Sequence, residues 1–304
     1  MAGYVPGEQP RGDGILKLNT NESPYPPSPR ALEAMSAILR TDALRKYPDP
    51  VGSAFRAAAA RVLDVDPDGI LIGNGSDDIL TILTRAFVPE GGRIVSPAPS
   101  YLLYATLADI QGARFEAVPF TPAWGLPNPW PAVGAHLTLV ANPNSPTGTV
   151  VSHADLETLA RQCQSPLVID EAYVDFADAH ALALTRFPNV IVTRTLSKSY
   201  ALAGLRFWFA VAHPALVREL TKVKDSYNCD MLSLAGAQAA IEDQEYLRLM
   251  CDRIRATRTR MTAALRGLGF TVLDSQANFV WATRADHPVD PDGFGSIAGM
   301  PPQQ

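Results

Sequence analysis

The sequence predicts an α/β fold, in which a mostly parallel sheet of the seven-stranded type carries helices on both faces, with a smaller α+β domain beside it. Short apolar runs alternate with longer helical patterns over most of the chain. Several of these runs, such as 167–169, are continuously apolar, which is typical of strands buried on both faces of a parallel sheet. In such sheets, ligands tend to bind at the carboxyl ends of the strands.

The strands are predicted where short apolar runs lie between turn residues: 70–72, 93–96, 114–120, 137–141, 167–170, 190–193 and 207–212. Helices are predicted between them at 77–87, 101–111 and 152–162. Two more helical patterns, joined by proline-rich turns, lie in 14–60. A long helical pattern runs from about 233 to 266, and two further strands are predicted at 271–273 and 278–281.

This order of elements predicts five segments. They are a flexible N-terminus (1–13), an arm that forms part of the small domain (14–45), a large domain (46–232), a partial C-terminal small domain (233–284) and an irregular tail (285–304). The tail has no periodicity and is dense in proline, glycine and aspartate.

Composition excludes several classes of protein. Hydrophobic residues make up 47% of the 304 residues, which is globular composition. The net charge of -5 gives no basic field for nucleic acid. The three cysteines lie far apart, so we expect neither a metal site nor a disulfide framework. No segment resembles a signal peptide or a membrane span, so we expect a cytoplasmic protein. The arginines of 253–260 alternate with apolar residues at helical spacing, which predicts a solvated helix face.

A glycine-rich turn joins the first predicted strand to the following helix. Gly75 and Ser76 precede Asp77, where the helix is expected to open. Glycines let backbone N–H groups approach an anion, and a helix N-terminus adds positive potential, so this arrangement suits a phosphate. An ordinary turn with a helix cap is the alternative.

Two ionisable residues follow predicted strands. Asp170 ends an apolar run, where a buried carboxylate needs a cation or strong donors. A protonated pyridine nitrogen would be such a partner, and Tyr173 could reach a ring hydroxyl; an Asp that caps the next turn is the alternative. Lys198 follows another buried-type strand, where desolvation lowers the pKa of an amine and makes it a nucleophile. A surface loop lysine is the alternative reading.

The surroundings of Lys198 suit a phosphate as well. Thr195 and Ser197 precede the lysine and Arg206 follows it, and hydroxyls with a guanidinium are good phosphate partners. The cradle, the strand-end Asp170 and this lysine segment occur in an order that resembles the fold-type I enzymes that depend on pyridoxal 5′-phosphate (PLP). The resemblance implies that Asp170 binds the pyridine nitrogen, Lys198 forms the Schiff-base bond and Arg206 binds the phosphate, within the large domain.

Two further segments resemble cofactor-binding parts of these enzymes. The turn 141–148 resembles their Asn-rich Pro-Thr-Gly turn, which implies that Asn144 contacts the ring oxygen; Ser145, directly before the Pro-Thr-Gly, is the alternative. The segment 99–101 resembles the one whose aromatic residue stacks on the ring, which implies Tyr101, with Tyr104 as the alternative.

The chain resembles the histidinol-phosphate aminotransferase family over roughly residues 14–283. Four segments carry this narrower resemblance: 18–24 (LNTNESP), 45–49 (RKYPD), 225–228 (DSYN) and 275–279 (SQANF). The resemblance implies a homodimer in which Tyr47 reaches the phosphate of the cofactor bound by the other subunit. It also implies a set of substrate-binding residues: Asn21, Glu22, Tyr25, Asn228 and Asn278.

The implied reaction is amino transfer between histidinol phosphate and 2-oxoglutarate, a step of histidine biosynthesis, in which Lys198, Asp170 and Tyr173 are the catalytic residues. Threonine-phosphate decarboxylase and aromatic amino-acid aminotransferase are alternatives on the same scaffold. A PLP-binding protein without activity is another, as is the product of a damaged reading frame. Relatives carry substrate-binding arginines on later strands, whereas here the resemblance fades after about Thr283. We therefore expect weak activity or none.

Overall fold

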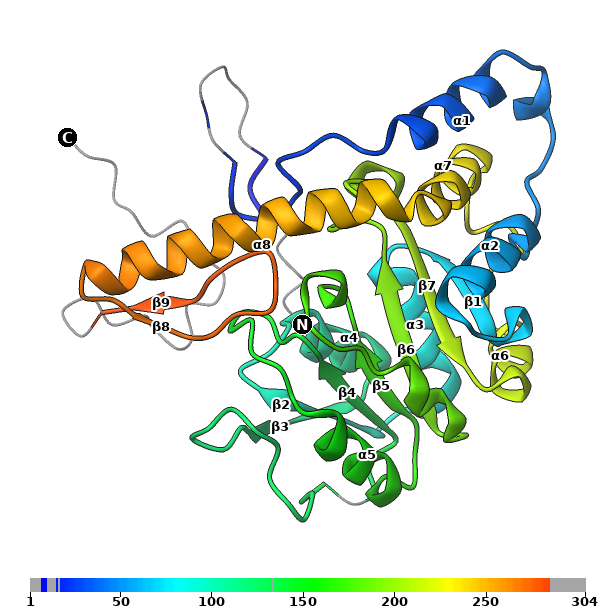
Figure 1. Cartoon of the computed structure of the whole chain (residues 1–304). Helices are drawn as coiled ribbons and strands as arrows, with labels where there is room; N and C mark the ends of the chain where they lie inside the picture. The colour runs from blue at the N-terminus through cyan, green and yellow to red at the C-terminus, as the bar shows by residue number, and fades with distance from the viewer. Residues whose placement is uncertain (1–6, 10–14, 16, 133, 285–304) are drawn as a thin grey trace.

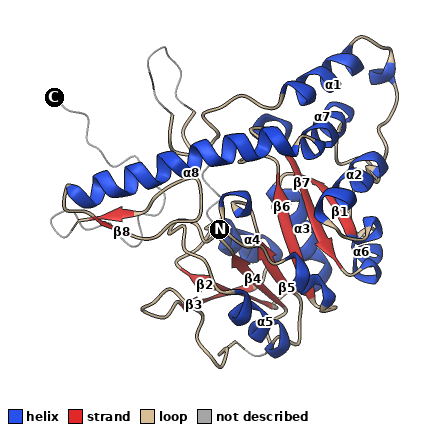
Figure 2. Ribbon diagram, viewed as in Figure 1, coloured by secondary structure: helices blue, strands red, loops and turns tan. Residues whose placement is uncertain are grey.

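A seven-stranded sheet forms the centre of the computed structural model, which describes residues 7–9, 15, 17–132 and 134–284 (Figures 1 and 2). Its strands are β1 (Ile70–Asn74), β2 (Arg93–Ala98), β3 (Arg114–Pro119), β4 (Leu137–Ala141), β5 (Leu167–Asp170), β6 (Val190–Thr195) and β7 (Phe207–Ala212). Their spatial order is β1-β7-β6-β5-β4-β2-β3. β7 runs antiparallel to both of its neighbours, β1 and β6, and the other strands of this sheet all run in the same direction. The prediction of a mostly parallel sheet is therefore confirmed.

Helices cover both faces of the sheet, as Figure 2 shows. One face packs against α3 (Ser76–Phe87), α4 (Leu103–Gln111) and α6 (Pro214–Leu220). The other packs against α2 (Ser53–Leu63), α5 (His153–Gln162) and α7 (Met231–Glu242), and α1 (Pro29–Leu39) lies on α7. Successive strand residues point to opposite faces, so Val190 and Val192 join one core and Ile191 the other. Within the described part of the chain, no helix is both long and apolar enough to cross a membrane.

Short 3-10 helices fill several connections between these elements: η1 (Ala43–Arg45), η2 (Pro67–Gly69), η3 (Val174–Phe176), η4 (Leu182–Arg186) and η5 (Ala203–Leu205).

The C-terminal part differs from the prediction in two places. The helical pattern from 233 is two helices, because α7 ends before Asp243 and α8 (Gln244–Gly267) begins after it. Asp243 interrupts the pattern because its carboxylate accepts hydrogen bonds from the Tyr246 N–H and from the Ser28 hydroxyl, as a helix cap does.

The strand predicted at 278–281 is absent. Within the described residues, β8 (Thr271–Val272) pairs instead with β9 (Ala282–Thr283), which begins one residue later than the predicted strand ends. The Ser275 hydroxyl donates to the Phe279 carbonyl and the Asn278 amide donates to the Asn21 carbonyl. These side-chain bonds hold the segment in a turn, where a strand would need ladder bonds. The predicted tail, 285–304, and most of the predicted flexible N-terminus, 1–13, lie outside the described residues.

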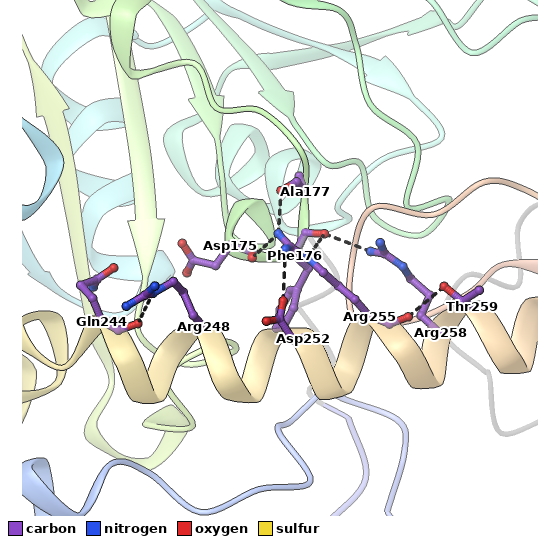
Figure 3. Close-up of polar contacts among 9 residues, drawn as sticks. All are labelled: Asp175, Phe176, Ala177, Gln244, Arg248, Asp252, Arg255, Arg258 and Thr259. Atoms are coloured by element: carbon purple, nitrogen blue, oxygen red, sulfur yellow. Dashed lines mark hydrogen bonds and ion pairs between the residues drawn. The ribbon is translucent and has the colours of Figure 1, made fainter.

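The arginine-rich stretch of α8 is only partly a solvated face, so that prediction is wrong for two of its members (Figure 3). Arg255 donates to the backbone carbonyls of Asp175, Phe176 and Ala177. Arg258 donates to the carbonyls of Phe176 and Ala277. The helical period predicts that these residues share one face of α8. It does not predict that the loop after β5 packs against that face.

Strand register brings the chemically interesting loops to one edge of the sheet. Asp170 pairs with Ala141 on one side and with Thr193 on the other, at the carboxyl ends of three parallel strands. Two more strands end or begin at the same edge. Thr195, the last residue of β6, pairs with Trp208 near the start of β7, and Asn74, the last residue of β1, pairs with Phe207. The loops that carry the predicted site residues are therefore neighbours in space, although far apart in sequence.

Candidate active site

Lys198 lies in the loop after β6, and its side chain is partly buried, with its amine surrounded by protein atoms. Its Nζ donates a hydrogen bond to the carbonyl oxygen of Thr20 at 2.7 Å and lies 5.7 Å from the centre of the Tyr173 ring. Burial lowers the pKa of Lys198 to about 8; the negative charge of Glu22 opposes this shift, and the positive charge of Arg206 adds to it. Lys198 forms no ion pair within the described residues, and the neutral amine becomes the larger fraction above about pH 8.

Asp170, at the end of β5, is the corresponding buried acid. It is 3% exposed, and its carboxylate accepts hydrogen bonds from the Tyr104 hydroxyl at 2.8 Å and the Ala172 N–H at 3.1 Å. Burial raises the pKa of Asp170 to about 6, and the hydrogen bonds oppose this shift. Among the described residues it meets neutral donors and forms no ion pair. A buried carboxylate in such a setting favours a cationic partner.

The turn before α3 and the guanidinium of Arg206 form a narrow cradle. Gly75 has a φ of +91°, and a Cβ there would lie 2.6 Å from an Nη of Arg206, so only glycine leaves this space open. The Thr195 hydroxyl accepts from the Ser197 N–H at 2.9 Å. Ser76 opens the helix, so unpaired N–H groups and the guanidinium lie at one place, which suits a phosphate.

The remaining residue of the predicted cradle is Asp77, in the first turn of α3. Its carboxylate accepts a hydrogen bond from the Ser76 hydroxyl at 2.9 Å, and the residue is exposed.

The residues of this edge fit PLP, the cofactor that the resemblance implies. The cofactor has three polar features: a phosphate, an aldehyde and a basic ring nitrogen. The cradle with Arg206 fits the phosphate, the buried amine of Lys198 fits the aldehyde, and Asp170, which meets no cation within the described residues, fits a protonated ring nitrogen. All three lie at the edge where the strand ends gather.

The two tyrosines proposed for ring stacking have different surroundings. Tyr101 is half-buried, and its ring meets the Tyr104 ring edge-on, with 5.5 Å between centroids. Tyr104 is fully buried within the first turn of α4, and its hydroxyl is bonded to Asp170. Because Tyr104 is enclosed by core residues, Tyr101 remains the candidate for stacking and Tyr104 has another task.

Asn144 and Ser145 also differ in their contacts. The Asn144 amide donates to the Pro99 carbonyl and the Thr147 hydroxyl, and it accepts from the Ser100 hydroxyl. Asn144 is 1% exposed, whereas the neighbouring Ser145 is half-buried. The amide is therefore already engaged in holding two loops together, which favours Ser145 as the group available to a ligand.

Several predicted substrate residues converge on Lys198. The Asn21 amide donates to the Tyr173 hydroxyl at 3.2 Å, and the Asn278 amide donates to the Asn21 carbonyl at 2.9 Å. Glu22 lies close enough to act on the charge of Lys198, and it forms a 2.7 Å ion pair with Lys17. The N-terminal arm thus brings polar side chains to the buried amine, where a substrate would lie.

The other two predicted substrate residues have different neighbours. The Asn228 amide donates to the Asp78 carboxylate at 2.7 Å and accepts from Lys224 at 2.9 Å. Tyr25 packs beside the cluster on α8, where the Arg253 guanidinium lies 5.6 Å from the centre of its ring. Their roles at a substrate remain predictions.

Tyr47 is 79% exposed and stacks on Tyr227, with 4.5 Å between ring centroids. A tyrosine this exposed is available to a second subunit.

Sequence reasoning missed two contacts of the lysine loop. One is the carbonyl of Thr20, which accepts from Lys198 and gave no signal because any residue offers that group. The other is the hydrogen bond from the Ser199 hydroxyl to the Asp175 carboxylate. Asp175 follows the strand-end Asp170 closely in the sequence, but no local pattern indicated that its partner would be Ser199.

Comparison with known proteins places this site in a family. The family description "Aminotransferase class I and II" matches residues 13–292. A histidinol-phosphate aminotransferase from Rhodopirellula baltica is 52% identical over 92% of this chain and 78% of its own length. Another, from Trichormus variabilis, is 48% identical over 92% of this chain and 81% of its own length.

The chain belongs to the histidinol-phosphate aminotransferase family. Solved structures agree with this membership. The histidinol-phosphate aminotransferase of Sinorhizobium meliloti, determined with pyridoxal-5′-phosphate, is similar with a TM-score of 0.77 at 28% identity, over 86% of this chain and 73% of that one. An aspartate aminotransferase from Thermus thermophilus has a TM-score of 0.76 at 22% identity, over 86% and 75% of the two chains, a likeness in fold alone. As a member of this family, the chain is a PLP-dependent aminotransferase, and it has the fold that the sequence predicted.

Proposed function

We propose that this chain transfers an amino group between histidinol phosphate and 2-oxoglutarate, a step of histidine biosynthesis in the cytoplasm. Relatives named histidinol-phosphate aminotransferase at 45–52% identity over most of the chain support this substrate. The single observation that carries the chemistry is the buried amine of Lys198, whose pKa is about 8, at the same edge of the sheet as Asp170 and the Arg206 cradle.

Each residue has a proposed task. Arg206, with the backbone of Gly75 and Ser76 and the hydroxyls of Thr195 and Ser197, binds the phosphate of PLP. Asp170 holds a proton on the ring nitrogen, Tyr173 donates to the ring oxygen, Tyr101 lies on the ring, and Asp77 supports the cradle. When bound, PLP supplies an aldehyde and an electron-withdrawing ring. The Nζ of Lys198 would hold the aldehyde carbon covalently, with release of water, and as a free amine it would take the proton from the α-carbon of the substrate and deliver it to the cofactor carbon that carried the aldehyde.

Substrate binding is proposed for the polar residues around the amine. Asn21, Glu22, Tyr25 and Asn278 come from the N-terminal arm and the turn before β9. The bond from Asn278 to Asn21, the packing of Tyr25 on the cluster that contains Tyr173, and the charge of Glu22 acting on Lys198 support a single binding region. Asn228 is proposed there as well, at its margin. This assignment joins the arm (14–45) and the segment 233–284 into one small domain that closes over the large domain (46–232).

Covalent trapping tests the proposal. Purified protein with PLP should show the visible absorbance of the cofactor bound to a lysine. Borohydride should then fix the cofactor covalently on the peptide that contains Lys198. Lys198→Ala should lose the label, whereas Lys222→Ala, which removes an exposed amine paired with Glu219, should keep it. A label on another lysine would disprove the assignment.

An assay then separates the candidate reactions. The chain should transfer the amino group of histidinol phosphate to 2-oxoglutarate faster than that of phenylalanine, and it should not decarboxylate threonine phosphate. Preference for either alternative substrate would replace the proposed one. Bound cofactor with no turnover of any of them would indicate a PLP-binding protein without activity.

A further inference from the structure

Tyr104 has a hydrogen bond that its sequence position does not explain. It lies in α4, is 0% exposed, and donates its hydroxyl to Oδ2 of Asp170 at 2.8 Å. The bond joins residues 66 positions apart, from a helix on one face of the sheet to the end of a central strand. A buried tyrosine hydroxyl needs a hydrogen-bond partner, and for Tyr104 that partner is the carboxylate of Asp170.

The bond affects both groups. Burial and the nearby Asp170 charge raise the pKa of Tyr104 well above its usual range, so its hydroxyl is a neutral donor at every physiological pH. For Asp170, burial favours the protonated carboxyl, and the Tyr104 hydroxyl is the foremost of the hydrogen-bond donors that oppose it. A carboxylate has about four acceptor positions, and the Tyr104 hydroxyl occupies one on Oδ2 while the Ala172 N–H occupies one on Oδ1. The carboxylate is thereby fixed in orientation, and its other positions remain for a cation.

We propose that Tyr104 is a positioning residue that keeps Asp170 ionised and oriented toward the ring nitrogen of the cofactor. This inference rests on the proposed function, because it concerns the acid that holds the ring proton. Tyr104 does not touch the cofactor in this scheme and acts only through Asp170. The packing of its ring against Tyr101, with 83° between their planes, gives it a second link to the site.

Tyr104→Phe tests this task, because it keeps the ring and removes only the hydroxyl. The first measurement is the infrared titration of the Asp170 carboxyl in the full chain without cofactor, with its band identified as the one lost in Asp170→Asn. The midpoint should be near 6 in the parent chain. It should rise by about one unit or more in Tyr104→Phe, since a hydrogen bond to a charged group is lost.

The second measurement is the pH dependence of the absorbance of bound PLP. A ring nitrogen that holds its proton less firmly changes the midpoint of this absorbance, so Tyr104→Phe should move it by about half a unit or more. In the Asp170→Asn background, Tyr104→Phe should move it no further, because the acid through which Tyr104 acts is gone. Tyr246→Phe is the matched control: it removes a hydroxyl that donates to the Pro26 carbonyl, and both midpoints should stay.

The outcomes separate this inference from the proposed function. If Tyr104→Phe folds and the Asp170 midpoint stays within about 0.3 units, Tyr104 only fills space and the inference is overturned. The same holds if the cofactor midpoint moves equally in both backgrounds. If the parent chain binds no PLP, the proposed function fails, while the carboxyl titration still decides whether Tyr104 keeps Asp170 ionised.

Discussion

Asp170 is buried and Lys198 is partly buried, and the loss of solvent moves their pKa values in opposite directions. An apolar environment disfavours the charged form of either group, so it lowers the pKa of the amine to about 8 and raises that of the acid to about 6. Asp170 is therefore ionised above about pH 6, and Lys198 is mostly neutral above about pH 8. The site is better prepared to capture the cofactor on the alkaline side of neutrality.

A pH dependence follows for the capture of PLP by the cofactor-free chain. Only the neutral amine attacks an aldehyde, so the rate should rise about tenfold per pH unit below pH 8 and level off above it. Stopped-flow absorbance measures this rate directly. Lys198→Ala should show no such phase. If the rate instead keeps rising with pH until about pH 10.5, the ordinary pKa of lysine, then burial does not lower the pKa of this amine.

Asn144 and Ser145 should respond differently to truncation. Asn144→Ala removes three side-chain hydrogen bonds in a buried turn and should lower the free energy of unfolding by about 1–3 kcal/mol. Ser145→Ala should leave stability within about 0.5 kcal/mol and weaken PLP binding instead. Chemical denaturation and a cofactor titration measure the two effects. If Asn144→Ala weakens binding without loss of stability, Asn144 is the residue that contacts the cofactor.

At the scale of elements, α8 is joined to the sheet through the loop that follows β5 (Figure 3). Arg255 and Arg258 donate to carbonyl groups of residues 175–177, at the end of η3, where the backbone has no further helical partners. The Asp175 side chain of this loop accepts from the hydroxyl of Ser199, next to Lys198. The long helix thus supports the loop on which the lysine depends.

Truncating these arginines should destabilise the chain. Arg255→Ala removes the guanidinium donor from the carbonyls of Asp175 and Ala177, while that of Phe176 keeps Arg258, so the free energy of unfolding should fall by about 1–3 kcal/mol. Arg258→Ala should have a smaller effect in the same direction. The matched control is Arg260→Ala, an exposed arginine of the same helix, whose effect should stay within about 0.5 kcal/mol. Equal effects of Arg255→Ala and Arg260→Ala in urea denaturation would show that the carbonyl contacts contribute nothing.

At the scale of the whole molecule, the surface around Tyr47 is available to a second copy of the chain. Tyr47 and Tyr227 form an exposed stacked pair, and Leu44 nearby in sequence is 56% exposed. Exposed aromatic and apolar groups of this kind are typical of an interface. We propose a homodimer in which Tyr47 of each chain reaches the phosphate site of the other.

Tyr47→Phe should weaken cofactor binding in that dimer by about tenfold or more, because one hydrogen bond to a charged acceptor is lost. Fluorescence titration with PLP measures the change, and solution scattering measures the oligomer. Tyr227→Phe keeps the stacked pair, removes the neighbouring hydroxyl, and should bind as the parent chain does. A monomer that holds the cofactor normally would contradict the shared site.

The sequence determined the fold class and most of its elements by itself. Hydrophobic periodicity is a local property, and it placed the seven strands of the sheet to within a few residues. Asp170, Lys198 and Arg206 could be named because each has a marked local context: a strand end, a run of hydroxyl residues and a fixed spacing. The same reasoning missed the break at Asp243 and the turn at 278–281, where side-chain hydrogen bonds replaced the expected pattern.

Only the tertiary structure decided which side chains meet. The bond from Tyr104 to Asp170, the bond from Lys198 to the Thr20 carbonyl and the bonds from Arg255 to the loop after β5 all join residues more than 60 positions apart. No sequence period encodes such pairs, because they depend on strand order and on which face each helix covers. Burial has the same origin: the pKa values of Lys198 and Asp170 shift because distant segments exclude water from them, and that exclusion exists only once the chain has folded.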